Sequence, residues 1–119
     1  MNFCWVTIPV NDLEVSLEFY YGILGLTIDS RMSGGAILAF LGDKDKPKIE
    51  LIQRVKKVEG KSSSPITIGI EVESLQEAIL MLSQHGIELS RGPFSPNPHI
   101  EFAYVFDPDG YEVQLVEHK

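Results

Sequence analysis

The chain has 119 residues, of which 44% are hydrophobic, and a formal net charge of −7 at pH 7. This length suits one compact domain with a core that needs no covalent cross-links. The acidic balance argues against nucleic acid and against anionic membrane surfaces as partners, because both attract basic proteins.

A single cysteine, Cys4, excludes an intrachain disulfide framework, and its predicted place in the first strand favours a buried, inert thiol. No apolar run approaches the ~20 residues of a membrane span. Met1 is followed by a strand pattern rather than by a basic leader segment. We therefore expect a cytoplasmic protein.

The first predicted elements are a strand and a helix. Residues Trp5 to Val10 are rich in β-branched and aromatic types, which favours a strand. Asn11 is a helix-capping type, and Glu14 stands three residues later, where a capping box places its carboxylate. Gly25 is typical of a helix end. The apolar stripe between them, at helical spacing, consists of Leu13, Leu17, Tyr20 and Leu24.

Three further strands complete the first half and give the order β-α-β-β-β. They are predicted at Leu26 to Met32, Ala36 to Leu41 and Lys48 to Gln53. The first two are candidates for a hairpin, because a Ser-Gly-Gly sequence joins them. Residues 54–65 are basic and rich in serine, and we interpret them as a solvated linker.

The second half repeats this order. Ser74 and Glu77 form a second capping pattern, and an Asp-Pro-Asp-Gly turn at 107–110 precedes the last strand. Residues Gly92 to His99 hold three prolines and are predicted to form a loop, which could serve as a lid over a site. The predicted elements are strands at 66–72, 87–90, 100–106 and 111–117 and a helix at 75–85.

The two halves are related by a constant offset of 62 residues over the first strand and the helix. The offset relates Val10 to Val72, Leu13 to Leu75, Leu17 to Ile79 and Tyr20 to Leu82. Such a repeat predicts two modules, 1–53 and 66–119, joined by the linker 54–65 within a single domain, 1–119. We predict an α+β fold in which two βαβββ modules, related by a pseudo-twofold axis, form a curved mixed sheet with helices on the outer face.

Strand alternation predicts which side chains face away from the helices. These include Trp5, Thr7, Glu50, Thr67 and Gln114. A sheet face of mixed polar and apolar character suits a ligand cavity. Phe102, Tyr104 and Phe106 also share a face, which either lines this cavity or packs on a partner subunit.

Three stretches carry a family likeness: NDLEVSLEFY at 11–20, IELI at 49–52 and DPDGYEVQLVE at 107–117. Together with the paired modules, they resemble the vicinal oxygen chelate superfamily. That group includes glyoxalase I, extradiol dioxygenases, and fosfomycin- and bleomycin-resistance proteins. The likeness covers almost the whole chain and implies a cavity on the concave face of the sheet.

The resemblance also implies where a divalent ion would be chelated. In metal-dependent members the ligands come from the first and last strand of each module, and those positions fall on Trp5, Glu50, Thr67 and Gln114. Only Glu50 is an ordinary metal ligand, because an indole N–H cannot coordinate and the other two are weak oxygen donors. We therefore expect no metal cofactor; the alternative is Zn, Ni, Mn or Fe. His99, near Glu101, is a spare candidate ligand.

Three functions remain open. The first is a metal-free protein that binds a small molecule, as the bleomycin-resistance type does by sequestration. The second is a metal-dependent lyase or isomerase of the glyoxalase kind, with Glu50 as ligand and catalytic base. The third is a role in protein assembly only, with a cavity that no longer binds a ligand. The expected ligand-binding residues are Trp5, Thr7, Glu50, Thr67, Tyr104 and Gln114. We also expect a homodimer, because a curved open sheet leaves edges to cover.

Overall fold

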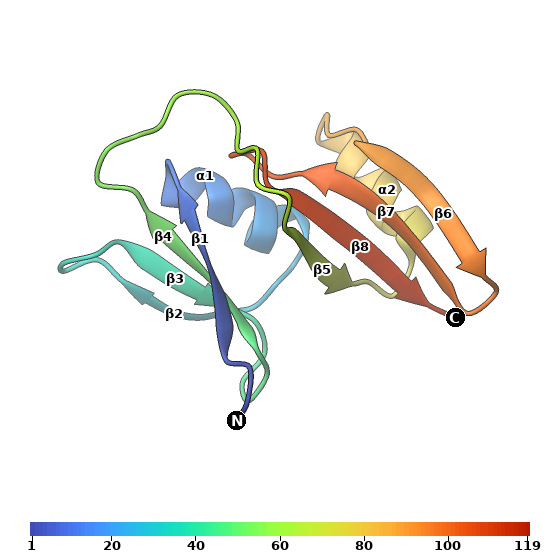
Figure 1. The fold of residues 1–119 in the computed structure, drawn as a ribbon, viewed down its shortest axis with the longest axis horizontal. Coiled ribbons are helices and arrows are strands. Elements are labelled where there is room, and N and C mark those ends of the chain that lie inside the picture. Colours follow the sequence, from blue (N-terminus) through green and yellow to red (C-terminus); the bar gives the residue numbers. More distant parts are fainter. The chain divides into compact units, whose positions relative to one another are not determined.

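The computed structural model describes residues 1–119 and divides into two units, Met1–Gly60 and Lys61–Lys119 (Figure 1). The boundary falls inside the predicted linker. None of the helices combines the length and the apolar composition that crossing a membrane requires.

The first unit contains a four-stranded mixed sheet in the order β1-β4-β3-β2 (Figure 1). β1 runs parallel to β4, and the other neighbouring strands are antiparallel. Its elements are β1 (Trp5–Val10), α1 (Leu13–Leu17), the π-helix η1 (Glu18–Ile23), β2 (Ile28–Met32), β3 (Leu38–Leu41) and β4 (Lys48–Gln53). The predicted order β-α-β-β-β is therefore confirmed.

The second unit has the same connectivity, with a sheet in the order β5-β8-β7-β6 and β5 parallel to β8. Its elements are β5 (Thr67–Glu71), α2 (Leu75–Gln84), β6 (Arg91–Asn97), β7 (Ile100–Phe106) and β8 (Glu112–His118). The α+β fold of two βαβββ modules is confirmed, with the mixed sheet present as two four-stranded sheets.

Each sheet buries the face that its helix covers. In β1 the side chains of Ile8 and Val10 are buried, whereas Trp5, Thr7 and Pro9 are exposed. α1 contacts β4, and α2 contacts β7 and β8. The buried set on these elements includes Leu13, Leu17, Ile49, Leu51, Leu75, Leu82, Ala103, Val105, Val113 and Leu115. The two faces assigned from strand alternation are therefore correct.

The repeat extends to the start of each helix. The backbone N–H of Leu13, the first residue of α1, donates to Oε1 of Gln53 at 2.9 Å. The N–H of Leu75, the first residue of α2, donates to Oε1 of Glu117 at 2.7 Å. Both acceptors lie near the end of their module's last strand. Each module thus satisfies one of the helix's unpaired N–H groups from its own sheet.

The cap of α1 corrects one prediction. The N-cap is Asp12, whose Oδ1 accepts hydrogen bonds from the N–H groups of Glu14 at 3.0 Å and Val15 at 3.4 Å. Asn11 instead binds the linker: its Nδ2 donates to the carbonyl of Val58 at 2.8 Å, and its Oδ1 accepts from the Val58 N–H at 2.9 Å. Only an amide side chain can donate and accept in this way. The cap predicted at Ser74 is confirmed.

We expect Asp12→Ala to lower the free energy of unfolding by about 1 kcal/mol, because two N–H groups lose their acceptor. Urea denaturation of the parent and the variant measures the difference. Asp12→Asn keeps a capping oxygen and is the control, with an expected loss of only a few tenths of a kcal/mol. Equal stability of the alanine variant and the parent would show that the cap contributes nothing.

The π-helix η1 accounts for a break in the repeat. Tyr20 and Leu82 are 62 residues apart, but the helix-ending glycines, Gly25 and Gly86, are 61 apart, so the first helical segment has one extra residue. η1 contains the wider turn that this residue requires, and the N–H of Leu24 donates to the carbonyl of Phe19 at 2.9 Å. Both glycines have the positive φ of a helix end, +81° and +75°.

β6 was predicted wrongly. The proline-rich segment forms a strand, and the short strand predicted at Ile87 to Ser90 is absent. β6 lies at the edge of its sheet, and its paired residues are Arg91, Phe94 and Asn97, with register shifts between them. Pro93 and Pro96 fall between these paired positions. Prolines are tolerated there because an edge strand with bulges does not need every N–H.

The Asp-Pro-Asp-Gly turn holds the second half of the linker. Oδ1 of Asp107 accepts from the N–H groups of Asp109 and Tyr111, both at 2.9 Å, which closes the predicted turn. Nζ of Lys61 donates to the carbonyl of Pro108 at 2.7 Å, and the N–H of Ser62 donates to that of Asp109 at 2.7 Å. The linker therefore contacts the turn directly.

Candidate ligand-binding site

The six predicted ligand-binding residues lie in two groups of three, one in each unit. The first face, defined as the helix-free face of the first sheet, carries Trp5, Thr7 and Glu50. The second face, on the sheet of the second unit, carries Thr67, Tyr104 and Gln114. Parallel pairing of the first and last strands brings Thr7 beside Glu50 and Thr67 near Gln114, and antiparallel pairing of β7 with β8 brings Tyr104 beside Gln114.

Thr7 and Glu50 form a hydrogen-bonded pair on the first face. They are direct neighbours in the register of β1 and β4, and Oγ1 of Thr7 donates to Oε1 of Glu50 at 2.6 Å. The Glu50 side chain is half-buried, so this bond fixes the carboxylate's orientation while its other oxygen remains available.

Trp5 presents an open aromatic surface on the same face. Its ring packs edge-to-face on Phe40 of β3, with centroids 5.1 Å apart and an interplanar angle of 75°. The residue is nevertheless 50% exposed. Phe40 lies opposite Glu50 in the register and was missed by the sequence analysis. The signal was present, since Phe40 alternates with the buried Ala39 and Leu41.

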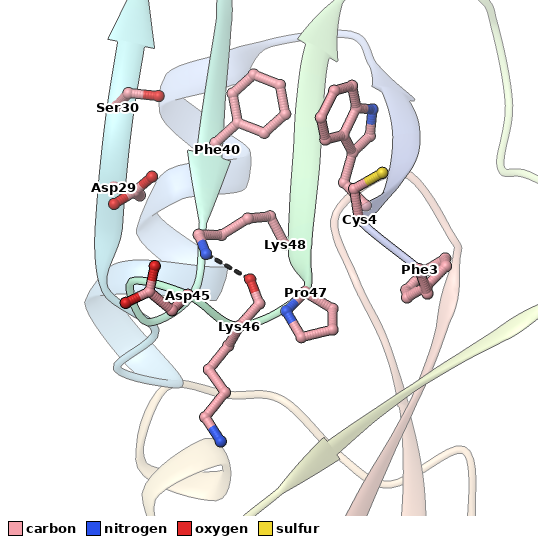
Figure 2. Close-up of a pocket in the computed structure, with 10 residues that line it drawn as sticks. Phe3, Cys4, Asp29, Ser30, Phe40, Asp45, Lys46, Pro47 and Lys48 are labelled. Carbon is pink, nitrogen blue, oxygen red and sulfur yellow. Dashed lines mark hydrogen bonds between the residues drawn. The ribbon is translucent and has the colours of Figure 1, made fainter. Parts of the chain in front are cut away.

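A hollow of about 410 Å³ adjoins these rings (Figure 2). Its walls come from residues 3–5, from residues 29–30 with Phe40, and from the turn at 45–48. Cys4 lines it and is exposed, so the expectation of a buried thiol was wrong. The Lys48 ammonium group donates to the carbonyls of Asp43 and Lys46, the second of which is drawn in Figure 2. These bonds tie the turn to β4.

On the second face, Gln114 lies between Gly69 of β5 and Tyr104 of β7 in the sheet register. A Cβ on Gly69 would lie 3.9 Å from Oε1 of Gln114, so this glycine leaves the amide uncovered. Phe102 and Phe106 lie opposite Val116 and Glu112. The three aromatic residues of β7 therefore share the helix-free face, a point that alternation alone left open.

Arg91 of β6 organises one end of this face, and the sequence analysis missed it. Its guanidinium lies 3.7 Å from the centroid of the Tyr104 ring and donates to both carboxylate oxygens of Glu112, at 3.2 and 2.9 Å. The Ser90 hydroxyl adds a third bond to Glu112 at 2.9 Å. The hydrogen bonds from Arg91, with that from Ser90, lower the pKa of the Glu112 carboxyl.

This lowered pKa predicts a pH dependence of stability. Because the folded-state pKa of Glu112 lies below the ordinary value of 4.5, its contribution is present above pH 4.5 and is lost as pH falls through the folded-state pKa. We expect Glu112→Gln to be less stable than the parent at neutral pH, with the difference vanishing in acid. Urea denaturation across pH measures this. Glu88→Gln, at an exposed side chain, is the matched control. A difference that persists unchanged into strong acid would contradict the assignment.

The histidines do not form a metal site within either unit. His99 lies in the turn before β7, while Glu101 pairs with the ammonium group of Lys119 at 3.2 Å. His85 contacts the carbonyl of Met81 at the end of α2, and His118 pairs with Glu71. No group of three or more His, Cys, Asp or Glu side chains is arranged to hold a metal ion.

Both the sequence and the fold of this chain are similar to those of known proteins. The family model of the Glyoxalase/Bleomycin resistance protein/Dioxygenase superfamily matches residues 3–115. Lactoylglutathione lyase of Escherichia coli O157:H7 is 30% identical over 129 residues, which cover 100% of this chain and 94% of that protein. The solved structure of Leishmania major glyoxalase I matches with a TM-score of 0.83 at 25% identity. The match covers 98% of this chain and 86% of the Leishmania chain. TnmS3, an antibiotic binding protein from Streptomyces sp. CB03234, shares the fold, with a TM-score of 0.73 at 18% identity and coverage of 100% and 97%.

Proposed function

We propose that this chain, which belongs to the Glyoxalase/Bleomycin resistance protein/Dioxygenase superfamily, binds a small molecule and does so without a catalytic metal. The observation that carries the proposal is Trp5, which is 50% exposed at the wall of a hollow of about 410 Å³. The family resemblance implies a metal-ligand position here, and an indole cannot fill that role. A rigid aromatic surface in a concavity suits a planar or apolar ligand.

The donor set at the four ligand positions does not fit a divalent ion. The indole of Trp5 offers only an N–H donor, and the Thr67 hydroxyl and the Gln114 amide are neutral oxygen donors. Glu50 is the single anionic group, and one of its oxygens already accepts a hydrogen bond from Thr7. Tightly held catalytic metals in proteins take several imidazole or carboxylate ligands.

Thr7 and Glu50 supply direction to a ligand whose ring lies on Trp5. The oriented carboxylate can accept a hydrogen bond or pair with a positive charge, and such few placed polar groups fix a ligand's orientation. The involvement of Thr67, Tyr104 and Gln114 with the same ligand stays a prediction. So do the homodimer, which light scattering tests, and the cytoplasmic location.

The alternative is a metal-dependent lyase that resembles lactoylglutathione lyase. It is favoured by the names of the curated relatives, including the Escherichia coli protein that is 30% identical to this chain. In that case Glu50 would be a metal ligand and would act on a proton near the ion. This hypothesis is weaker because Trp5, Thr67 and Gln114 are not ordinary metal ligands.

Elemental analysis of the purified protein after dialysis separates these two functions. We expect less than stoichiometric zinc, nickel, manganese or iron, both in the parent and in Glu50→Gln, because no competent ligand set is present. A stoichiometric metal in the parent that is lost in Glu50→Gln would favour the lyase. Loss of an activity on chelation, and its return with metal, would establish it.

A further inference from the structure

We propose that the hollow beside Trp5 selects ligands that carry a positive charge next to an aromatic ring. The inference rests on the proposed function and names the class of ligand for that site. It follows from which charges around the rings are free and which are already engaged.

The carboxylates near the rings lack cationic partners. Asp29 of β2 and Asp45 of the turn both line the hollow, and neither side chain forms a hydrogen bond or an ion pair (Figure 2). Glu50, opposite Phe40 in the sheet, is bonded only by the neutral hydroxyl of Thr7. Two carboxylates without a partner therefore line the hollow, and the carboxylate of Glu50 belongs to the neighbouring strand beside Phe40.

Two lysines, Lys46 and Lys48, also line the hollow, and neither pairs with its carboxylates. The ammonium group of Lys48 donates to the backbone carbonyls of Asp43 and Lys46, so two of its three N–H groups are engaged within the turn. The side chain of Lys46 extends away from Phe40 and Asp29 in Figure 2. The two carboxylates of the hollow therefore have no ion-pair partner, whereas one of its two ammonium groups is bound to the turn.

The rings themselves favour the same sign of charge. The face of an indole carries a negative potential, and it attracts an ammonium group that lies over it. The chain as a whole has a formal net charge of −7, which raises the local concentration of cations around it. Ring, carboxylates and net charge therefore all favour a cationic aromatic molecule over an anionic one.

A pair of probes with one ring and opposite charges tests the inference. Phenethylammonium and 3-phenylpropionate have similar size, and neither carries an indole, so quenching of Trp5, the only tryptophan, measures binding of both. We expect phenethylammonium to bind at least roughly tenfold more tightly than 3-phenylpropionate at low salt, with the preference falling as salt rises.

Variants then assign the preference to the hollow. Asp29→Asn and Asp45→Asn should each weaken phenethylammonium by roughly two- to fivefold and leave 3-phenylpropionate unchanged or tighter. Asparagine suits position 45 because it tolerates the positive φ of 67° found there. Glu18→Gln, an exposed carboxylate on η1, removes the same charge from the helical layer and is the matched control.

The possible outcomes distinguish this inference from the proposed function. Equal binding of both probes, with loss of both in Trp5→Ala by calorimetry, would overturn the charge selection and leave a binding site at Trp5. Tighter binding of 3-phenylpropionate, or no quenching by either probe, would also overturn it. A preference for phenethylammonium that Glu18→Gln reduces as much as Asp29→Asn would assign the effect to net charge and not to the hollow.

Discussion

Replacing Trp5 by alanine should weaken an aromatic ligand such as phenethylammonium by ~1–3 kcal/mol, because the ligand's ring loses the indole surface that shields it from water. The fold should survive, since Trp5 is 50% exposed and its main neighbour is the ring of Phe40. Calorimetric titration is the measurement of choice, because Trp5 is the only tryptophan and the variant has no indole fluorescence.

Two variants control this experiment. Trp5→Phe keeps a ring and should recover part of the affinity. Tyr21→Ala removes an aromatic side chain that is 54% exposed on η1, outside the first face, and should leave binding unchanged. If Trp5→Ala binds as tightly as the parent, the site lies elsewhere. If it unfolds the protein, Trp5 belongs to the core and the interpretation of the first face is wrong.

Gly110→Ala should lower the free energy of unfolding by about 2–4 kcal/mol, the largest stability effect that we expect. Gly110 has a φ of +90°, which strains any residue with a Cβ. That Cβ would also lie 2.6 Å from Cβ of Lys61 and 2.9 Å from the backbone nitrogen of Ser62. The linker packs so closely against the turn that the added methyl group would force the linker to move. Overpacking of this kind costs about 1–3 kcal/mol by itself.

Gly34→Ala is the matched control for this substitution. Nothing lies within 4 Å of a Cβ built at Gly34, and its φ is not in the positive range. Its stability should equal that of the parent or exceed it slightly, because alanine restricts the unfolded chain. Urea denaturation of both variants gives the comparison. Equal stability of Gly110→Ala and the parent would show that the linker does not pack on the turn as described.

Much of the fold could be predicted because the two halves of the sequence repeat the same pattern of strand and helix. Leu13 and Leu75, equivalent in the repeat, are the first residues of their helices, and the caps, stripes and ending glycines follow in the same order. Local chemistry is sufficient for such features. The assignment of sheet faces also followed from alternation, since a strand with one buried face must place every second side chain there.

Other features depend on partners that the sequence does not name. Asn11 and Asp12 are both good capping types. The Asn11 amide binds the carbonyl and the N–H of Val58, 47 residues away, and this contact leaves Asp12 as the cap. Pro93 and Pro96 indicated a loop because a central strand excludes proline. Their strand is tolerated only because β6 lies at the edge of its sheet, and that place is set by the whole topology.

The geometry of the candidate site could be predicted only in part. Trp5, Thr7 and Glu50 could be placed on one face from strand alternation, and their pairing confirms it. The hollow could not, because it is built by Asp29, Phe40 and the turn around Asp45, which meet only through the register of β2, β3 and β4. Whether each predicted residue binds a ligand stays a prediction.

The most direct test of the central claim, ligand binding at Trp5 without a metal, is a titration of protein that has been dialysed against a chelator. Quenching of Trp5 by phenethylammonium would be measured before and after stoichiometric zinc, nickel, manganese or iron is added. We predict the same affinity in every case, because the proposed site binds its ligand through the indole, Glu50 and Thr7 and needs no ion. Quenching that appears only after a metal is restored would contradict the account and favour the metal-dependent lyase.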